Sequence, residues 1–256
     1  MNNSNKIWFK RWWGVLIIII SAIILFFLAL SASYFIGEIK NAKLKSSQTS
    51  QTQTGQNLGG SKYDAAVGDH YWLGSANAKI TIVEFGDFAC PSCLSAYHAI
   101  GEISAKYKND IKFIWRDYPI IAEYSTDLAL AARCAGDPPV SGSGNDQNLF
   151  WRMHDKLFQN QAAIASLAVQ YSADPTQFNE QLTNLLVSLA NQVGADPVKF
   201  KACLNQQKYL PGIQKDLADG KNFGITGTPT YFIDGYKLAG DVPVEVFTKM
   251  IEQLKK

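Results

Sequence analysis

The sequence has few cysteines and histidines, which are common metal ligands, and almost no net charge. Its 256 residues include only four cysteines and three histidines, and the formal net charge is +2. This near balance of charge gives no reason to expect a nucleic acid or an acidic partner. His70, His98 and His154 have no spacing that suggests a metal site, so we expect them to be structural. No internal repeat is apparent, and the 47% hydrophobic composition suffices for one domain of about 190 residues.

Charge is absent altogether from residues 12–37. The stretch from Val15 to Ile36 consists mostly of Ile, Leu, Phe and Ala, and about 20 apolar residues span a bilayer as a helix. Aromatic residues flank it, as at membrane interfaces. A cleaved signal peptide is the alternative, although its apolar region is usually only about 7–15 residues long. We therefore expect residues 1–37 to form a cytoplasmic tip and a single transmembrane helix.

Residues 38–66 read as a flexible linker. Between Ser46 and Gly60 the chain is Ser, Thr, Gln, Asn and Gly except for Leu58, and such a run cannot bury enough apolar surface to become ordered. Basic residues flank the span nearly equally on both sides. Those on the N-terminal side lie closer to it, which slightly favours an inner N-terminus. We expect a single-pass protein of the cell membrane whose remaining residues lie outside the cytoplasm.

One stretch carries the chemistry: Thr81 to Cys93. The β-branched and aromatic residues from Ile80 to Phe85 predict a strand, and Pro91 suits the first turn of a helix that starts at Cys-Pro-Ser-Cys. Cys90 then lies among unpaired N–H groups at the positive end of the helix dipole, and both favour a thiolate. Cys93, one turn on, can close a disulfide with it. We expect a dithiol–disulfide switch with an exposed, reactive outer sulfur.

A zinc site and a soft-metal carrier are two other possible functions of the Cys-x-x-Cys pair. Zinc requires four ligands, and the two remaining cysteines lack this spacing. A non-catalytic carrier could use both thiols as soft ligands for copper-site assembly. A purely structural disulfide is disfavoured, because Pro91 and Ser92 in so small a ring make the bond strained and reducible.

Two motifs together resemble DsbA-like thioredoxin-fold disulfide oxidoreductases. Glu84 to Cys93, Glu-Phe-Gly-Asp-Phe-Ala-Cys-Pro-Ser-Cys, resembles the active-site segment of that family. Gly224 to Gly235, Gly-Ile-Thr-Gly-Thr-Pro-Thr-Tyr-Phe-Ile-Asp-Gly, resembles its cis-proline loop and the following strand. The resemblance covers roughly Asp69 to Lys256. It implies an α/β thioredoxin fold in residues 67–256, with a helical insertion at about 121–210, preceded by the transmembrane helix and linker.

Further elements are expected along this domain. A second strand at Ile111–Pro119 follows the first helix, and a strand–helix–strand crossover makes the two strands parallel. Asp234-Gly235 is a strong hairpin turn pair. Pro, Gly and Ser make 137–146 a loop. The expected helices are 123–135, 149–160, 177–194, 197–209, 211–223 and 243–254, and the hairpin strands are 230–234 and 236–238.

Glu84, Thr228 and Pro229 are further candidate residues of the site, because of their position and the resemblance. Glu84 lies on the strand that enters the site, and a buried carboxylate there is costly without a role or partner. The resemblance makes it a proton acceptor for Cys93, whereas a solvated edge residue is the alternative. The resemblance also makes Pro229 cis beside Cys90, leaving the Thr228 backbone free to bind substrate peptide. A trans proline that starts an edge strand is the alternative.

Cys134 and Cys203 both fall in predicted helices. Outside the cytosol a leftover pair of cysteines more often forms a bridge, and similar cysteine positions occur in some members of the family. The bridge would be either structural or redox-active. Two buried free thiols that behave as small apolar residues are the alternative.

The sequence therefore predicts an extracytoplasmic protein thiol–disulfide oxidoreductase that needs no metal or other cofactor in the domain itself. Its Cys90–Cys93 disulfide would oxidise dithiols of unfolded or partly folded secreted proteins through a mixed disulfide. The resemblance implies a quinone-linked membrane partner that reoxidises it. A reductase or isomerase, or the metal carrier, is the alternative function, because Pro91-Ser92 does not determine the direction of transfer.

Overall fold

The structure is a computed structural model, and it describes residues 62–66, 71–137 and 145–256. The predicted transmembrane helix and nearly all of the predicted linker lie outside these residues. Within the described ranges, no helix is both long enough and apolar enough to cross a membrane.

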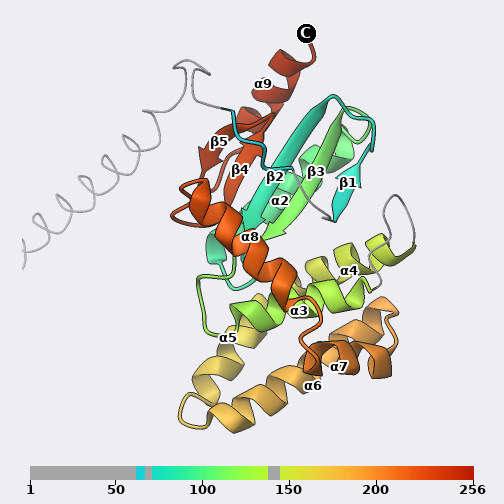
Figure 1. The fold of residues 1–256 in the computed structure, drawn as a ribbon, viewed down its shortest axis with the longest axis vertical. Coiled ribbons are helices and arrows are strands. Elements are labelled where there is room, and N and C mark those ends of the chain that lie inside the picture. Colours follow the sequence, from blue (N-terminus) through green and yellow to red (C-terminus); the bar gives the residue numbers. More distant parts are fainter. Residues whose placement is uncertain (1–61, 67–70, 138–144) are drawn as a thin grey trace, which may run out of the picture. The chain divides into compact units, whose positions relative to one another are not determined.

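A five-stranded sheet forms the centre of the described part (Figure 1). Its order is β1-β3-β2-β4-β5, with β2 (Ile80–Gly86) and β3 (Ile111–Asp117) parallel and the other neighbours antiparallel. The parallel pairing of β2 with β3 confirms the predicted crossover. β2 also pairs with β4, so it has a neighbouring strand on both sides. The remaining strands are β1 (Trp72–Gly74), β4 (Thr230–Ile233) and β5 (Tyr236–Ala239).

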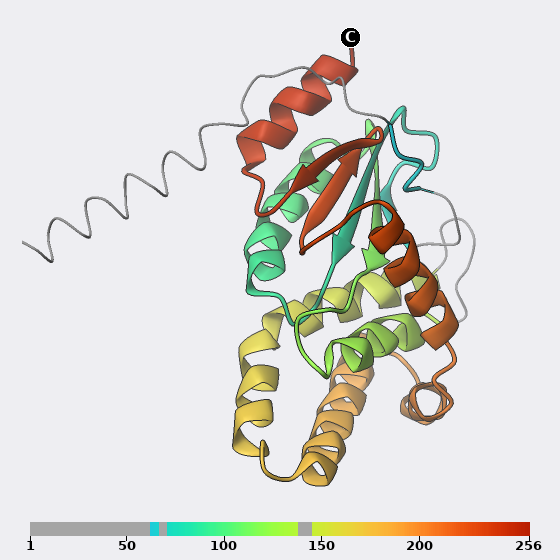
Figure 2. The same cartoon turned by 60° about the vertical axis from the view of Figure 1, so that its left-hand side comes forward.

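Helices cover both faces and one end of the sheet (Figures 1 and 2). α2 (Pro91–Lys106) and α9 (Val244–Leu254) bury apolar residues in one core with Ile82 and Tyr231 of the sheet. On the opposite face, α8 (Leu210–Asn222) packs with Tyr63 on Val83 and Phe85. The helices beyond the carboxyl ends of β2 and β3 are α3 (Ser125–Ala135), α4 (Asn145–Gln159), α5 (Gln161–Gln170), α6 (Pro175–Val193) and α7 (Pro197–Asn205).

Most predicted elements are present within a few residues of their expected ends. The hairpin between β4 and β5 turns at Asp234 and Gly235, whose φ values of 47° and 84° suit an Asp-Gly turn. Asp174 and Asp196 accept hydrogen bonds from N–H groups in the first turn of α6 and α7, and each helix begins at the proline directly after its Asp. Most of the loop predicted at 137–146 lies outside the described residues.

Two elements were not expected from the sequence. α5 has a nearly uniform run of Ala, Ile, Leu and Val, with no side-chain N-cap bond and with Ile164 as its only fully buried residue. It therefore lacks the amphipathic stripe on which helix prediction depends. β1 is only three residues long and is defined by its antiparallel pairing with β3, a contact between segments about 40 residues apart.

A buried network of charged side chains joins the sheet to α3 and α8. Arg116 of β3 donates to Asp216 of α8 through Nε and Nη2, at 2.8 and 2.7 Å. Arg133 of α3 donates to Asp117 at 2.6 Å and also to Asp216. Arg116 also pairs with Asp219. Removing one member of such a network would leave an uncompensated buried charge, so these contacts fix how the helical part meets the sheet.

Cys134 of α3 and Cys203 of α7 form a disulfide in the structure, with their Cα atoms 5.8 Å apart. Beside it, Asp137 accepts hydrogen bonds from Lys208 at 2.6 Å and from the Tyr209 hydroxyl at 2.5 Å. The bridge and this surface pair therefore fasten the same two segments, which are about 70 residues apart in the sequence.

We predict that replacing both bridging cysteines, Cys134→Ala with Cys203→Ala, lowers the free energy of unfolding by about 2–4 kcal/mol, because the unfolded chain gains the freedom of an opened loop. Urea unfolding of the oxidised protein measures this. Oxidation of a dithiol peptide by the same variant should be unchanged. A loss of that activity would show instead that the bridge takes part in electron transfer.

Candidate active site

The strand–turn–helix around Cys90 forms as the sequence predicts. β2 ends at Gly86, Cys90 is the N-cap residue of α2, and Pro91 occupies the first helical turn. Gly86 is required because Trp115 crosses it: a Cβ atom there would lie 2.2 Å from Cη2 of the tryptophan. The close approach of strand and indole brings the active-site loop against the core.

Asp87 ties this loop to a second loop. Its Oδ1 accepts from the Ala89 N–H, and its Oδ2 accepts from the N–H groups of Ile120 and Ile121, all at 2.8 Å. The side chain is buried, and a buried carboxylate is tolerated when it is hydrogen-bonded in this way. Ile120 and Ile121 themselves are 42% and 47% exposed. They therefore present an apolar surface beside the active-site loop, in a fixed position.

Cys90 and Cys93 are both free thiols in this structure, so it represents the dithiol form. The prediction of an exposed outer sulfur is wrong. Cys90 is 3% exposed and Cys93 is 0% exposed, because the loop before β4 covers the first cysteine. The Cys90 sulfur lies 3.3 Å from the Thr228 carbonyl oxygen. Only a thin layer covers it, however, since its neighbours Pro91 and Ser92 are exposed.

The two sulfurs differ strongly in acidity. A hydrogen bond from the Cys93 thiol is the largest influence on Cys90 and lowers its pKa from 9.0 to about 6, although partial burial opposes this. The Thr228 side chain and the N–H groups of Ser92 and Cys93 lower that pKa further, as expected at a helix N-terminus. Burial raises the pKa of Cys93 instead, and its hydrogen bond to Cys90 adds to that rise. Cys90 is thus the thiolate and Cys93 the protonated thiol at neutral pH.

Glu84 is buried in the middle of the sheet, which excludes the alternative of a solvated edge residue. It is 3% exposed and lies between Trp115 of β3 and Tyr231 of β4. Burial raises the pKa of its carboxyl from 4.5 to about 8, the Tyr231 hydroxyl lowers it, and the Cys90 thiolate raises it. Glu84 therefore holds a proton at neutral pH within electrostatic reach of both sulfurs.

The peptide bond between Thr228 and Pro229 is cis, as expected from the resemblance. Pro229 is buried and Thr228 is partly exposed. Thr230 fixes the loop by donating its hydroxyl hydrogen to the Gly227 carbonyl at 2.7 Å. The structure thus brings Thr228 and Cys90, 138 residues apart, into direct contact.

Gln161 was not identified from the sequence as a residue of this site. It is the first residue of α5, and its Nε2 donates to the carbonyls of Phe88 and Cys90 at 2.8 and 3.0 Å. No local signal marks it, because both contacts span more than 70 residues. The helical part is therefore bonded to the backbone on which Cys90 sits.

An aromatic cluster fills the space behind the active-site loop. Phe88 stacks on Trp115 with ring centroids 4.8 Å apart. His154 of α4 lies edge-on to Phe88 and to Trp115, at 5.5 and 4.8 Å. Burial lowers the pKa of His154, so it is an uncharged core residue, in agreement with the structural role expected for it. His98 is exposed on α2, and His70 lies outside the described residues.

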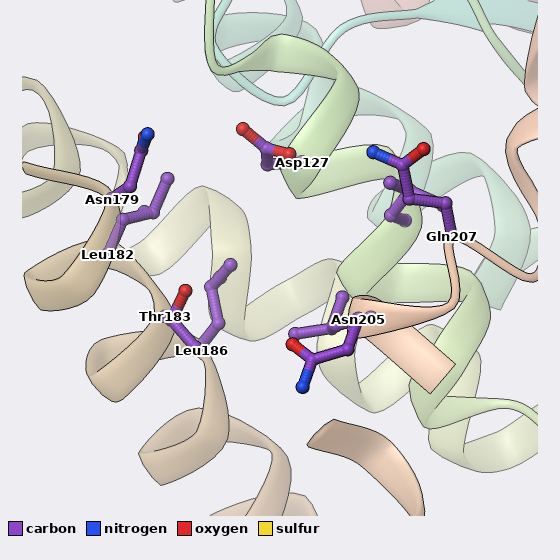
Figure 3. Close-up of a pocket in the computed structure, with 9 residues that line it drawn as sticks. Asp127, Asn179, Leu182, Thr183, Leu186, Asn205 and Gln207 are labelled. Atoms are coloured by element: carbon purple, nitrogen blue, oxygen red, sulfur yellow. The ribbon is translucent and has the colours of Figure 1, made fainter. Parts of the chain in front are cut away.

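A separate pocket of about 170 Å³ lies among α3, α6 and α7 (Figure 3). Asp127, Asn179 and Gln207 are among the polar side chains at its wall, and Leu182 and Leu186 line it as well. It contains none of the cysteines, nor Glu84 or Thr228. The redox chemistry of the chain therefore belongs to the site at the N-terminus of α2.

A strand–turn–helix with a Cys-x-x-Cys pair, faced by a cis-proline loop and flanked by helices, defines a thiol–disulfide oxidoreductase of the DsbA-like class. The chain belongs to the thioredoxin family: residues 66–253 match the family described as Thioredoxin.

Solved structures of the class are similar over most of their length. BdbD from Bacillus subtilis, in its oxidised form, is 25% identical, with a TM-score of 0.59 over 73% of this chain and 94% of that one. The thiol–disulfide exchange protein alpha-DsbA2 from Wolbachia pipientis is 19% identical, with a TM-score of 0.57 over 72% and 87%. DsbA from Chlamydia trachomatis is 17% identical, with a TM-score of 0.58 over 77% and 97%. The last two show likeness of fold alone.

Curated relatives match this chain over only a small part of their own length. The Na(+)/H(+) antiporter NhaA 1 of Salinispora arenicola is 28% identical over 180 residues, which are 70% of this chain and 24% of that protein. The antiporter NhaA of Herminiimonas arsenicoxydans is 25% identical over 183 residues, 72% of this chain and 25% of that protein. The chain thus spans about a quarter of the length of these relatives.

We predict that alkylation of the reduced protein by iodoacetamide follows the ionisation of Cys90 alone, with a midpoint near pH 6. Cys93→Ala removes the largest influence that lowers this pKa, so its midpoint should move toward 9. The rate of alkylation against pH, with mass spectrometry to locate the label, measures both. A midpoint of the variant that stays near 6 would contradict the assigned cause.

We also predict that Glu84→Gln changes how stability depends on pH. An unfolded Glu ionises near pH 4.5 and the folded one near 8, so the wild type loses stability as the pH rises from 4.5 to 8. The variant has no such loss. Its free energy of unfolding, relative to the reduced wild type, should rise over that interval by up to about 4 kcal/mol. Denaturant unfolding at pH 5 and pH 8 measures this, and a pH-independent difference would contradict the burial argument.

Proposed function

We propose that the protein oxidises dithiols of unfolded or partly folded secreted proteins, outside the cytoplasm. The observation that carries this direction of transfer is the low pKa of Cys90, about 6. A thiolate stabilised in the dithiol form makes the disulfide form the stronger oxidant, and it makes Cys90 a good leaving group. A reductase has no need of so stable a dithiol.

Each step involves a defined sulfur. A substrate thiolate attacks Cys90, the Cys90–Cys93 bond breaks, and its electron pair goes to Cys93, which takes the Glu84 proton. The second substrate thiolate attacks the substrate sulfur of the mixed disulfide, and Cys90 leaves as a thiolate. The substrate has then lost two electrons to the active-site pair. Binding of an extended apolar peptide near Cys90 is supported by the exposed side chains of Ile120 and Ile121 and by the contact between Thr228 and Cys90.

The second disulfide supports an extracytoplasmic location, because stable protein disulfides belong to oxidising compartments. Cys134 and Cys203 form such a bridge. The charge-free stretch from Val15 to Ile36 supports attachment to the membrane as a single-pass anchor. A quinone-linked membrane protein is the proposed partner that reoxidises Cys90 and Cys93. Isomerase or reductase activity is the alternative outcome of the test below.

We predict that Cys93→Ala accumulates mixed disulfides with substrate proteins at Cys90, whereas Cys90→Ala accumulates none, because only Cys90 is an acidic sulfur close to the surface. Each variant is first treated with DTNB, which converts an accessible thiol to its thionitrobenzoate disulfide and so supplies the oxidant. It is then incubated with a reduced unfolded secreted protein that carries one cysteine, whose thiolate displaces thionitrobenzoate, and non-reducing gels show the mixed disulfide. Equal accumulation in both variants would overturn the assignment of Cys90 as the attacked sulfur.

The direction of transfer is tested by equilibrating the wild type with glutathione buffers. We expect the Cys90–Cys93 pair to be more oxidising than the about −270 mV typical of thioredoxin. A more reducing value would favour the reductase. Titration of the reduced protein with Cu(I) under anaerobic conditions tests the metal carrier, and a stoichiometric tight complex without oxidase activity would favour that alternative.

A further inference from the structure

Two buried hydroxyls beside the active site, those of Thr228 and Tyr231, lack a hydrogen-bond partner of good geometry. Tyr231 of β4 is 0% exposed, and its hydroxyl oxygen has no partner of good geometry. Buried polar groups are almost always paired, and leaving one unpaired costs stability. The ring itself is held edge-on against Phe247 of α9, at 5.0 Å between centroids. The position of the hydroxyl is therefore set by packing rather than by a bond of its own.

The strand register places this hydroxyl next to Glu84. Glu84 and Tyr231 are directly opposite each other in the antiparallel pair of β2 and β4, so both side chains project from the same face of the sheet. That face is the one covered by α2, where Cys93 is buried. On the other side of Glu84, the Trp115 N–H already donates to Asp117 at 2.9 Å. Of the two side chains that flank Glu84, Tyr231 is therefore the one whose donor has no other acceptor.

The ionisable groups around this pair are few. Glu84 faces Cys90 and Cys93 from α2 and Tyr231 from β4. Tyr231 also faces Asp241, in the segment before α9, and Asp241 accepts a hydrogen bond from the Ser95 hydroxyl at 2.6 Å. Burial raises the pKa of Tyr231 well above its ordinary value, so the hydroxyl keeps its proton. It can donate to Glu84 but does not exchange protons with it.

We propose that Tyr231 is a positioning residue that donates a hydrogen bond to the Glu84 carboxylate whenever Glu84 has given its proton to Cys93. This rests on the proposed function, and it adds a residue to the proton path of that function. When a substrate thiolate breaks the Cys90–Cys93 bond, Cys93 takes the Glu84 proton and a buried carboxylate remains. A carboxylate in an apolar core is costly unless it accepts hydrogen bonds. The Tyr231 hydroxyl can donate a hydrogen bond to this carboxylate, so no water molecule is needed.

The same contact operates in reverse during reoxidation. With Cys90 in a mixed disulfide, the Glu84 carboxylate takes the proton of the Cys93 thiol, and the Cys93 sulfur attacks Cys90 and releases the bound thiol. This step requires ionised Glu84, so its rate rises with pH through the ionisation of that carboxyl. Loss of the Tyr231 hydroxyl removes an influence that lowers the Glu84 pKa. The rise should then occur at higher pH.

The test uses Tyr231→Phe and the mixed disulfide with glutathione. The reduced protein is mixed with oxidised glutathione between pH 5 and 10, and the lifetime of the Cys90–glutathione adduct is followed by acid quench and mass spectrometry. A hydrogen bond to a charged group is one of the stronger kinds, so we expect the midpoint to rise by about one pH unit. Below the midpoint this makes the adduct lifetime about tenfold longer.

A matched control separates this role from a structural one. Tyr118→Phe also removes a buried hydroxyl, one that donates to the Ile225 carbonyl at 3.0 Å, on the opposite face of the sheet. It should leave the midpoint unchanged, although it loses a hydrogen bond. Tyr231→Phe should show the reverse pattern: an unchanged or higher Tm and a shifted midpoint. An unshifted midpoint in Tyr231→Phe would overturn the proposal.

Glu84→Gln distinguishes failure of this inference from failure of the proposed function. That variant should lose the pH-dependent rise in adduct resolution, and adding Tyr231→Phe to it should change nothing more. If Glu84→Gln keeps the wild-type pH profile, Glu84 is not the proton acceptor, and both the role of Tyr231 and the proton step of the proposed function fail. If Glu84→Gln abolishes the rise and Tyr231→Phe alone does not shift it, only the role of Tyr231 fails.

Discussion

The buried pairing of Arg116 and Arg133 with acidic side chains is the contact on which the rest of the structure depends. Both arginines lie in the core, and neither charge is tolerated there without partners. Asp216 of α8 receives hydrogen bonds from both. Because one arginine comes from β3 and the other from α3, the sheet and the helical part can satisfy their charges only when they are docked together. The active site lies at that junction.

The network also reaches the active site through packing. Asp117 accepts from Arg133 and from the Trp115 indole, and Trp115 stacks on Phe88, two residues before Cys90. The dithiol is therefore surrounded by rigid groups. In that setting two cysteines three residues apart acquire opposite character. Cys90 accepts a hydrogen bond from the Cys93 thiol and lies among N–H donors at a helix start, whereas Cys93 lies wholly within the core. The difference in acidity follows from position rather than from residue type.

Local patterns were enough to predict the strand–turn–helix around Cys90, the parallel crossover and the hairpin at Asp234-Gly235, because each depends on neighbouring residues. The contact between Thr228 and Cys90 was expected only through resemblance to a family. What the sequence could not show are pairings that the folded chain creates. The partners of Arg116, the loop anchored by Asp87 and the bonds from Gln161 join segments about 30 to 100 residues apart. The burial of Cys90 was missed for the same reason, since a distant loop covers it.

The two bonds from Gln161 have a mechanical consequence. The amide of one side chain at the start of α5 donates to the carbonyls of Phe88 and Cys90, so the backbone of Cys90 is fastened to the helical part as well as to the sheet. A tilt of α5 away from the sheet would stretch both bonds and pull directly on the residue that caps α2. The position of α5 is thus coupled to the backbone of the reactive cysteine through the side chain of Gln161.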